Sequence, residues 1–377
     1  MKIRHFKHTT GLAALLCALG GLLHGAAQAQ AAWIVGQSAP LSGNNAVFGK
    51  DIRDGAQAWF KLVNSQGGVH GSPVELLTLD DQNQRKIAGE NTAKLLQNRN
   101  LVALFGYASA TLSLDAMPQA EKAGTLFFAP FSGANPVRKP SPVVHTLRAS
   151  YGDELEKMLS FWTGLGMKQV VVVHYDDEVG VQNLGVVKDY LARQGKQPQA
   201  FALERNAKID DARFNELVAL KPDVIINTVL SGPAAEISKR LVARGLYVPM
   251  SSLSFVGAQQ YIDAAGDAGA GVSISQVVPN TSASLPVIRE CGKALQDSGI
   301  TTPMNSTHLE ACIAAKVLTE AMRRSKKPGD PKALLAALRH LGSYDVGGYT
   351  VHYGPEQNHG SKFVELAMVT RNGRLRN

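Results

Sequence analysis

Short apolar runs alternate with amphipathic stretches along nearly the whole chain after residue 32. The segment QVVVVHYDD, residues 169–177, is apolar without a break at its centre, as expected for a strand buried on both faces of a parallel sheet. The stretch 51–66 instead repeats apolar side chains at helical spacing, with Ile52, Ala56 and Trp59 on one face. This alternation predicts an α/β protein with doubly wound parallel sheets, and about ten strands suggest two sheets and therefore two lobes.

Two segments interrupt the regular pattern. A helical pattern covers about residues 110–123, and we expect Pro118 to kink or restart that helix because proline has no N–H to donate. Near the C-terminus, YTVHYG (349–354) and KFVELAMVT (362–370) have strand character and are joined by a polar loop. We expect them to form a hairpin-like pair that lets the chain cross between the lobes once more.

Residues 1–29 have the organisation of a secretory signal peptide. A basic start is followed by GLAALLCALGGLL, an apolar run too short to span a bilayer comfortably, and Ala27-Gln28-Ala29 offers small residues to a signal peptidase. We therefore expect cleavage near Ala29 and export to the periplasm. Beyond this segment no stretch reaches the roughly 18 apolar residues of a membrane helix.

The charge and the cysteines narrow the possibilities. The formal net charge is +8, and loss of three basic residues with the signal peptide leaves +5. No basic run is interleaved with aromatic residues, so nucleic acid is not an expected partner.

Cys291 and Cys312 remain in the exported chain, where an oxidising compartment permits a disulfide. Both fall in predicted helices, and the sequence leaves open whether their sulfur atoms meet.

Small and hydroxyl-bearing residues follow several predicted strands. In doubly wound sheets ligands bind outside the carboxyl ends of the strands, where the free N–H groups of a starting helix attract a carboxylate. The junctions 106–111 and 130–133 follow strands that are neighbours in sequence, so they can hold one ligand together. A hydroxyl at such a place is also an ordinary helix cap. We predict that Ser109 or Thr111 lies near the ligand.

Three aromatic residues are candidates for the walls of the same site. Phe48 and Tyr107 occupy predicted loops where core packing is not obvious, although local packing is the alternative for each. Tyr151 begins the second half of the chain, at a position from which it can reach a cleft between the lobes.

The sequence contains few of the residue patterns that are typical of enzymes. Dinucleotide-binding, phosphate-loop, nucleophile-elbow and zinc-protease motifs are missing. The acid pairs Asp80-Asp81 and Asp176-Asp177 end predicted strands and are interpreted as turn and cap residues. The spacing of His308 and Glu310 does not place them on one helical face, so we expect no metal site, no cofactor and no enzyme.

One long phrase resembles a known family. PLSGNNAVFGKDIRDGAQAWFKLVNSQGGVHGSPVELLTLDD, residues 40–81, is similar to the start of the periplasmic branched-chain amino-acid-binding proteins, the solute receptors of ABC importers. The likeness continues through LFGYASAT, FFAPFSGANP, LRASYGDE and HLEACIAAKVLTEA. It implies two α/β lobes joined by three hinge crossings, with residues 33–149 and 278–360 in one lobe and 150–277 and 361–377 in the other.

The resemblance also implies where a ligand would be held. Family members bind the carboxylate with N–H groups and hydroxyls after the third strand, which corresponds to Ala108–Thr111 here. The loop Phe131-Ser132-Gly133 matches one that normally offers a carbonyl and a threonine to the ammonium group, and it contains no threonine. The second lobe usually supplies a tyrosine, where Val179 stands, and a glutamate, where Ser254 stands.

The groups that bind a carboxylate in this family are therefore present in this chain, and the groups that bind an ammonium are missing. An ammonium group in a closed cleft needs a counter-charge or several acceptors, and only Glu178 is a candidate substitute. We therefore expect a small carboxylate-bearing ligand, either a branched-chain amino acid or a related aliphatic or aromatic acid. We hypothesise that it lacks the ammonium group, with Phe255 as a further wall residue. The expected role is delivery of the solute by a monomeric receptor to a permease and its ATPase subunit. An exported sensor with the same fold is the alternative.

Overall fold

The computed structural model of the chain describes residues 1–2, 32–43, 45–205 and 208–376. The predicted cleavage site near Ala29 and all but the first two residues of the predicted signal peptide lie outside these ranges. Among the helices of the described ranges, none has both the length and the apolar character that crossing a membrane requires.

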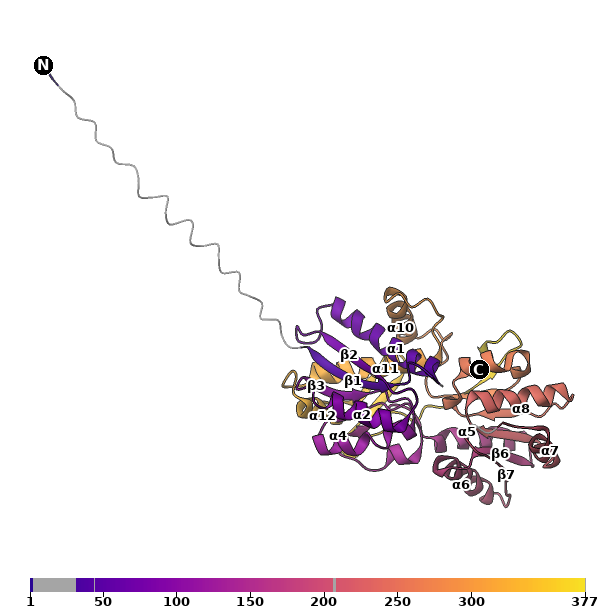
Figure 1. The fold of residues 1–377 in the computed structure, drawn as a ribbon. Coiled ribbons are helices and arrows are strands. Elements are labelled where there is room, and N and C mark those ends of the chain that lie inside the picture. Colours follow the sequence, from indigo (N-terminus) through magenta and orange to yellow (C-terminus); the bar gives the residue numbers. More distant parts are fainter. Residues whose placement is uncertain (3–31, 44, 206–207, 377) are drawn as a thin grey trace. The chain divides into compact units, whose positions relative to one another are not determined.

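The first lobe is built on a five-stranded sheet with the order β2-β1-β3-β4-β5, in which all neighbours are parallel. Figure 1 labels its strands β1, β2 and β3. Chain order reverses between β1 and β3, which creates a topological switch point where ligands commonly bind. The strands are β1 (Trp33–Ala39), β2 (Val74–Asp80), β3 (Leu101–Phe105), β4 (Leu126–Phe128) and β5 (Val144–His145). The helices among them are α1 (Ala46–Ser65), α2 (Arg85–Leu95), α3 (Ala110–Ser113) and α4 (Met117–Ala123).

The second lobe is built on a seven-stranded sheet with the order β14-β13-β10-β9-β8-β6-β7. The strands β6 to β10 pair with one another in parallel. Chain order reverses between β6 and β8, which is the switch point of this sheet. These strands are β6 (Val170–Tyr175), β7 (Gln199–Leu203), β8 (Val224–Thr228), β9 (Met250–Ser252) and β10 (Ser273–Gln276). The helices are α5 (Tyr151–Gly164), α6 (Glu178–Ala192), α7 (Asp211–Ala219), α8 (Ser231–Ala243) and α9 (Ala258–Ala265).

The chain then returns to the first lobe before it ends in the second. Helices α10 (Pro286–Asp297), α11 (Ser306–Arg324) and α12 (Pro331–Arg339) contribute to the same apolar core as β1 and β3. Strands β11 (Gly342–Asp345) and β12 (Thr350–Tyr353) form a small separate sheet. The last strands, β13 (Glu365–Val369) and β14 (Leu375–Arg376), join the seven-stranded sheet in antiparallel fashion. The predicted two-lobed, doubly wound α/β fold is therefore confirmed.

Two local predictions have different outcomes. Pro118 lies in the first turn of α4, which three residues separate from the end of α3, so the helix is restarted there as predicted. The predicted pairing of YTVHYG with KFVELAMVT is wrong, because β12 pairs with β11 and β13 pairs with β10. A short turn containing Gly347 and Gly348, both with positive φ, folds β12 back on β11, while β13 finds the open edge of β10.

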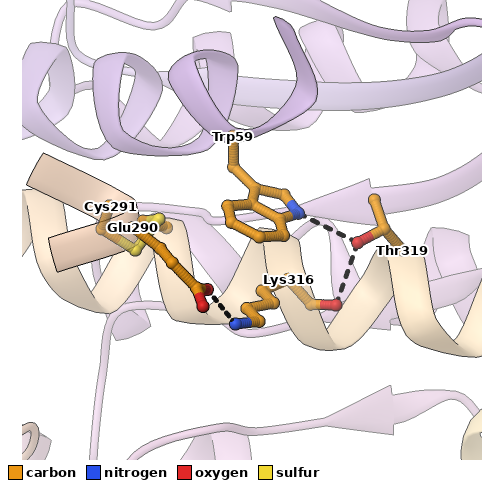
Figure 2. Close-up of a disulfide and its surroundings, with 6 residues drawn as sticks. Trp59, Glu290, Cys291, Lys316 and Thr319 are labelled. Carbon is orange, nitrogen blue, oxygen red and sulfur yellow. Dashed lines mark hydrogen bonds and ion pairs between the residues drawn. A yellow bond between two sulfur atoms is a disulfide. The ribbon is translucent and has the colours of Figure 1, made fainter. Parts of the chain in front are cut away.

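A disulfide joins α10 to α11. Cys291 and Cys312 are bonded, with their Cα atoms 6.0 Å apart, and both side chains are fully buried. Figure 2 shows the surrounding contacts, in which Glu290 pairs with Lys316 and Trp59 donates from its indole nitrogen to the Thr319 hydroxyl at 3.0 Å. The bond and its neighbours tie α10, α11 and α1 together within the first lobe.

A buried ion pair lies where the chain first passes from one sheet to the other. Arg148, between β5 and α5, binds both carboxylate oxygens of Glu310 in α11, at 2.8 and 2.6 Å. The two side chains are only 3% and 5% exposed. Glu154 in α5 is also buried and accepts bonds from the Ser254 N–H at 2.8 Å and the Ser275 hydroxyl. Burial raises the pKa of Glu154, against the opposing field of Arg148.

Candidate ligand-binding site

A cavity of about 710 Å³ is lined by residues that follow strands of both sheets. On the first lobe the lining comes from the start of α1, the start of α3 and the loop after β4, and includes Asn45, Phe48, Ser109, Thr111 and Ser132. On the second lobe it comes from the end of β6, the starts of α6 and α8, and the segments after β7 and β9. Both switch points therefore open on the same cavity, as the carboxyl ends of parallel strands do in this fold class.

Four helices begin at the cavity wall. The lining includes Ala46 at the first residue of α1, Ala110 at that of α3, Ser231 at that of α8, and Gly180 in the first turn of α6. The first N–H groups of a helix have no partner within the helix and carry partial positive charge. Their convergence favours a negatively charged group inside the cavity.

Five of the predicted site residues line the cavity. They are Phe48, Ser109, Thr111, Ser132 and Tyr151, and Phe255 lies with them. The Ser109 hydroxyl also accepts the Leu112 N–H at 3.2 Å, so this residue caps α3 while facing the cavity. The rings of Tyr151 and Phe255 lie 5.2 Å apart and form one apolar part of the wall.

The other five predicted residues lie behind the wall. Tyr107 is fully buried, with its hydroxyl 2.7 Å from that of Thr92, and Ala108 is packed in the first-lobe core. Phe131 packs edge-on against Phe48 with ring centres 6.1 Å apart. Gly133 lies under Tyr151, where an added Cβ would come within 2.7 Å of that residue.

The remaining member of that group, Ser254, turns toward the interior of the second lobe. Its N–H and hydroxyl donate to Glu154 at 2.8 and 3.0 Å. Glu178, the candidate counter-charge for an ammonium group, is exposed at the first residue of α6, where it accepts a bond from Gln182. It is not among the described residues that line the cavity.

Arg205 and Tyr175 are lining residues that sequence reasoning did not single out. Tyr175 ends β6, and its hydroxyl accepts the Leu230 N–H at 3.2 Å. The Arg205 guanidinium lies 4.3 Å from the centre of the Tyr175 ring and donates from Nε to Asp177 at 2.6 Å. Tyr175 fell within a strand end that the pattern identified. A single arginine after β7, in contrast, is typical of an ordinary solvated turn.

The charges around the cavity are one-sided. Arg205 is the lining residue with a full positive charge, and no aspartate or glutamate is found among the described lining residues. Asp177 itself stands behind Arg205 and caps α6 by accepting the Gly180 N–H at 2.9 Å. Gly180 allows the start of α6 to lie close to the end of β6, because an added Cβ would lie 2.0 Å from the Tyr175 carbonyl oxygen.

The comparisons with known proteins agree with this geometry. The sequence model of a family described as "Periplasmic binding protein" matches residues 33–374. This chain belongs to that family. The two lobes, the parallel sheets and the cavity at the strand ends are the architecture that the resemblance implied.

One curated relative and two solved structures illustrate the degree of similarity. Leu/Ile/Val-binding protein homolog 7 of Brucella suis biovar 1 (strain 1330) is 23% identical over 378 residues, 95% of this chain and 94% of the relative. A crystal structure of a possible leucine/isoleucine/valine-binding protein from Rhodopirellula baltica SH 1 has a TM-score of 0.87 and 24% identity, covering 93% of this chain and 97% of the other. A fatty acid ABC transporter substrate-binding protein from Thermomonospora curvata has a TM-score of 0.82 and 17% identity, covering 91% and 90%.

Membership of the family agrees with two further expectations. Proteins of this family bind substrates and are not enzymes, and the family name refers to the periplasm, where the signal sequence was expected to direct this chain. Within the described ranges, no group of three or more histidine, cysteine, aspartate or glutamate side chains is placed to hold a metal ion.

Proposed function

We propose that this periplasmic binding protein captures a small organic carboxylate without an α-ammonium group and delivers it to the permease of an ABC importer, which an ATPase subunit drives. The observation that carries the proposal is the charge of the cavity wall. The starts of α1, α3 and α8, together with Arg205, favour an anion, while the described lining residues include no carboxylate to receive a cation.

The missing acid argues against an amino acid. An ammonium group taken out of water needs an opposite charge or a full set of acceptors, since burial of an unpaired charge is strongly unfavourable. Neutral acceptors are present on the first lobe, including the hydroxyls of Ser109, Thr111 and Ser132. Two of these three have other bonds in this structure: Ser109 accepts from Leu112, and Ser132 contacts the Tyr151 hydroxyl at 3.3 Å.

The carboxylate end of the ligand is assigned to the first lobe. Ser109 and Thr111 flank the start of α3, and their hydroxyls can donate to an anion that also meets the first N–H groups of that helix. Phe48, Tyr151 and Phe255 offer apolar surface to the body of the ligand. Because the cavity receives residues from both lobes, hinge closure around the ligand would exclude water from these contacts.

The relatives support a carboxylate without fixing its body. One similar structure is described as a possible leucine/isoleucine/valine-binding protein and another as a fatty acid ABC transporter substrate-binding protein, and branched-chain amino acids and fatty acids all carry a carboxylate. The cavity of this chain has hydroxyl groups that can donate to a carboxylate. Its described lining includes no acid, because Ser254 stands where the family usually has a glutamate and Glu178 is exposed outside the lining.

A thermal-shift screen followed by calorimetry tests the proposal. Leucine, isoleucine, valine and phenylalanine are compared with the acids that lack the amino group, namely 4-methylpentanoate, 3-methylpentanoate, 3-methylbutanoate and 3-phenylpropanoate. We expect stabilisation by one or more of the deaminated acids and weaker or no stabilisation by the amino acids. Strong stabilisation by leucine with none by 4-methylpentanoate refutes the proposal.

A further inference from the structure

We propose that the ligand carries a second carboxylate, distant from the first, and that Arg205 is the residue that selects it. This inference rests on the proposed function, because it concerns the opposite wall of the same cavity. The first carboxylate belongs to the first lobe at Ser109 and Thr111, and the second belongs to the second lobe at Arg205.

The guanidinium of Arg205 is held in one orientation by two contacts. Asp177 accepts from Nε at 2.6 Å, and the guanidinium Cζ lies over the Tyr175 ring, 4.3 Å from its centre. Tyr175 is itself fixed, because it is only 5% exposed and its hydroxyl accepts from Leu230. An arginine held in this way loses less conformational entropy when it binds a second partner.

The bond to Asp177 leaves the donors of the outer edge available. It uses Nε, and among the described residues the terminal nitrogens Nη1 and Nη2 of Arg205 have no hydrogen-bond partner. The side chain is 46% exposed and lines the cavity. Two parallel N–H groups on one edge of a guanidinium match the two oxygens of a carboxylate.

The partner carboxylate does not cancel this preference. Asp177 is not among the described lining residues, and it shares its charge between Arg205 and the Gly180 N–H at the start of α6. Among the described residues, no aspartate or glutamate of either lobe lines the cavity. A ligand with one carboxylate therefore leaves the outer edge of Arg205 to water, whereas a dicarboxylate engages both lobes.

The size of the cavity permits such a ligand. Its volume of about 710 Å³ lies within the range of pockets for drug-sized molecules. The two carboxylate positions follow different sheets, Ser109 after β3 and Arg205 after β7. A ligand that joins them would contribute to the closed state from both sides of the hinge.

Calorimetry with matched acids tests the inference. Wild type is titrated with heptanoate and heptanedioate, and with 3-phenylpropanoate and 3-(4-carboxyphenyl)propanoate. We expect at least one dicarboxylate to bind about tenfold or more tightly than its monocarboxylate, the ratio for one charge-assisted contact. In Arg205→Gln this ratio falls to near one, because the dicarboxylate loses more affinity than the monocarboxylate, and Arg205→Lys retains part of it.

Arg193→Gln is a matched control in the same lobe. Arg193 also pairs with a carboxylate, Glu156 at 2.9 Å, and lies over a tyrosine ring, Tyr190 at 5.2 Å, but it does not line the cavity. This variant should keep the wild-type preference. Equal affinity of wild type for both members of every pair, or a preference that survives in Arg205→Gln, overturns the inference and leaves the proposed function standing. Absence of binding by every carboxylate overturns both.

Discussion

The charged side chains of the two lobes lie in different environments. In the first lobe and at the crossing beside it, the charged groups that matter are buried and paired, as in Arg148 with Glu310, and a disulfide ties two of its helices together. Toward the cavity this lobe presents neutral hydroxyls and amides. The second lobe has no disulfide among its described residues and brings a half-exposed arginine, Arg205, to the cavity. The difference teaches that changes in the first lobe should act mainly on stability, and changes at Arg205 mainly on ligand choice.

Arg148→Met should have the largest effect on stability. It leaves Glu310 as an uncompensated buried charge, so we expect the free energy of unfolding to fall by about 3–5 kcal/mol. Urea unfolding at pH 7 measures this. The double variant Arg148→Met, Glu310→Met should recover much of the loss because Glu310 is then no longer left as a buried charge without its partner. A loss below about 1 kcal/mol for the single variant would break the contrast with Arg205→Gln, whose stability we expect to be nearly that of wild type.

Removal of the disulfide comes next. The sequence separation of 21 residues gives an expected loss of about 3 kcal/mol for Cys291→Ala, Cys312→Ala, on the view that the bond mainly restricts the unfolded chain. The α10–α11 contact that Glu290 makes with Lys316 remains as a partial substitute. Ligand affinity of the folded variant should be unchanged in calorimetry. A large loss of affinity would show that the bond also shapes the cavity.

Asp81 predicts a pH dependence located in the first lobe. Burial raises the pKa of Asp81 to about 6, against hydrogen bonds from Ser38 and the Asn83 N–H. The folded state therefore holds this proton more tightly than the unfolded state. Its contribution to stability is complete below pH 4 and is lost as pH rises to about 6. Between pH 4 and pH 7, wild type should lose on the order of 2 kcal/mol relative to Asp81→Asn, measured by urea unfolding at several pH values.

The neighbouring acid is a control of opposite sign. Burial alone would raise the pKa of Asp80, but hydrogen bonds from Ser42, Gln82 and Leu41 lower it. Its contribution to stability is therefore present above pH 4 and is lost as pH falls. Asp80→Asn should weaken the protein at neutral pH, where Asp81→Asn strengthens it. The same sign for both variants would contradict the assignment.

The smallest effect on stability is expected at the cavity wall of the first lobe. Ser109→Ala removes the cap of α3 and should lower the free energy of unfolding by about 1 kcal/mol, together with a loss of affinity for carboxylates. Thr111→Val, at an exposed position in the same short helix, should lower affinity alone. Thermal unfolding and calorimetry on the same samples separate the two results. Unchanged affinity in both variants would place the carboxylate elsewhere in the cavity.

Residue-level prediction succeeded where a local pattern was sufficient. The unbroken apolar run of β6, the helical face of α1 and the restart at Pro118 lie in consecutive residues and are present in the structure. The pairing of the last strands failed because strand character does not identify a partner, and β13 found an open sheet edge beside β10. Five of ten predicted site residues line the cavity, since a strand end locates a corner but not the direction of each side chain.

The sequence by itself determined the alternation of buried strands and amphipathic helices, and with it the strand ends at which a cavity forms, because these depend on periodicity and local propensity. Tertiary structure alone decided that Cys291 meets Cys312, that Ser254 turns inward to Glu154 and that Arg205 reaches the cavity over Tyr175. The physical reason is that each of these contacts joins residues from separate elements, and its geometry depends on how those elements pack.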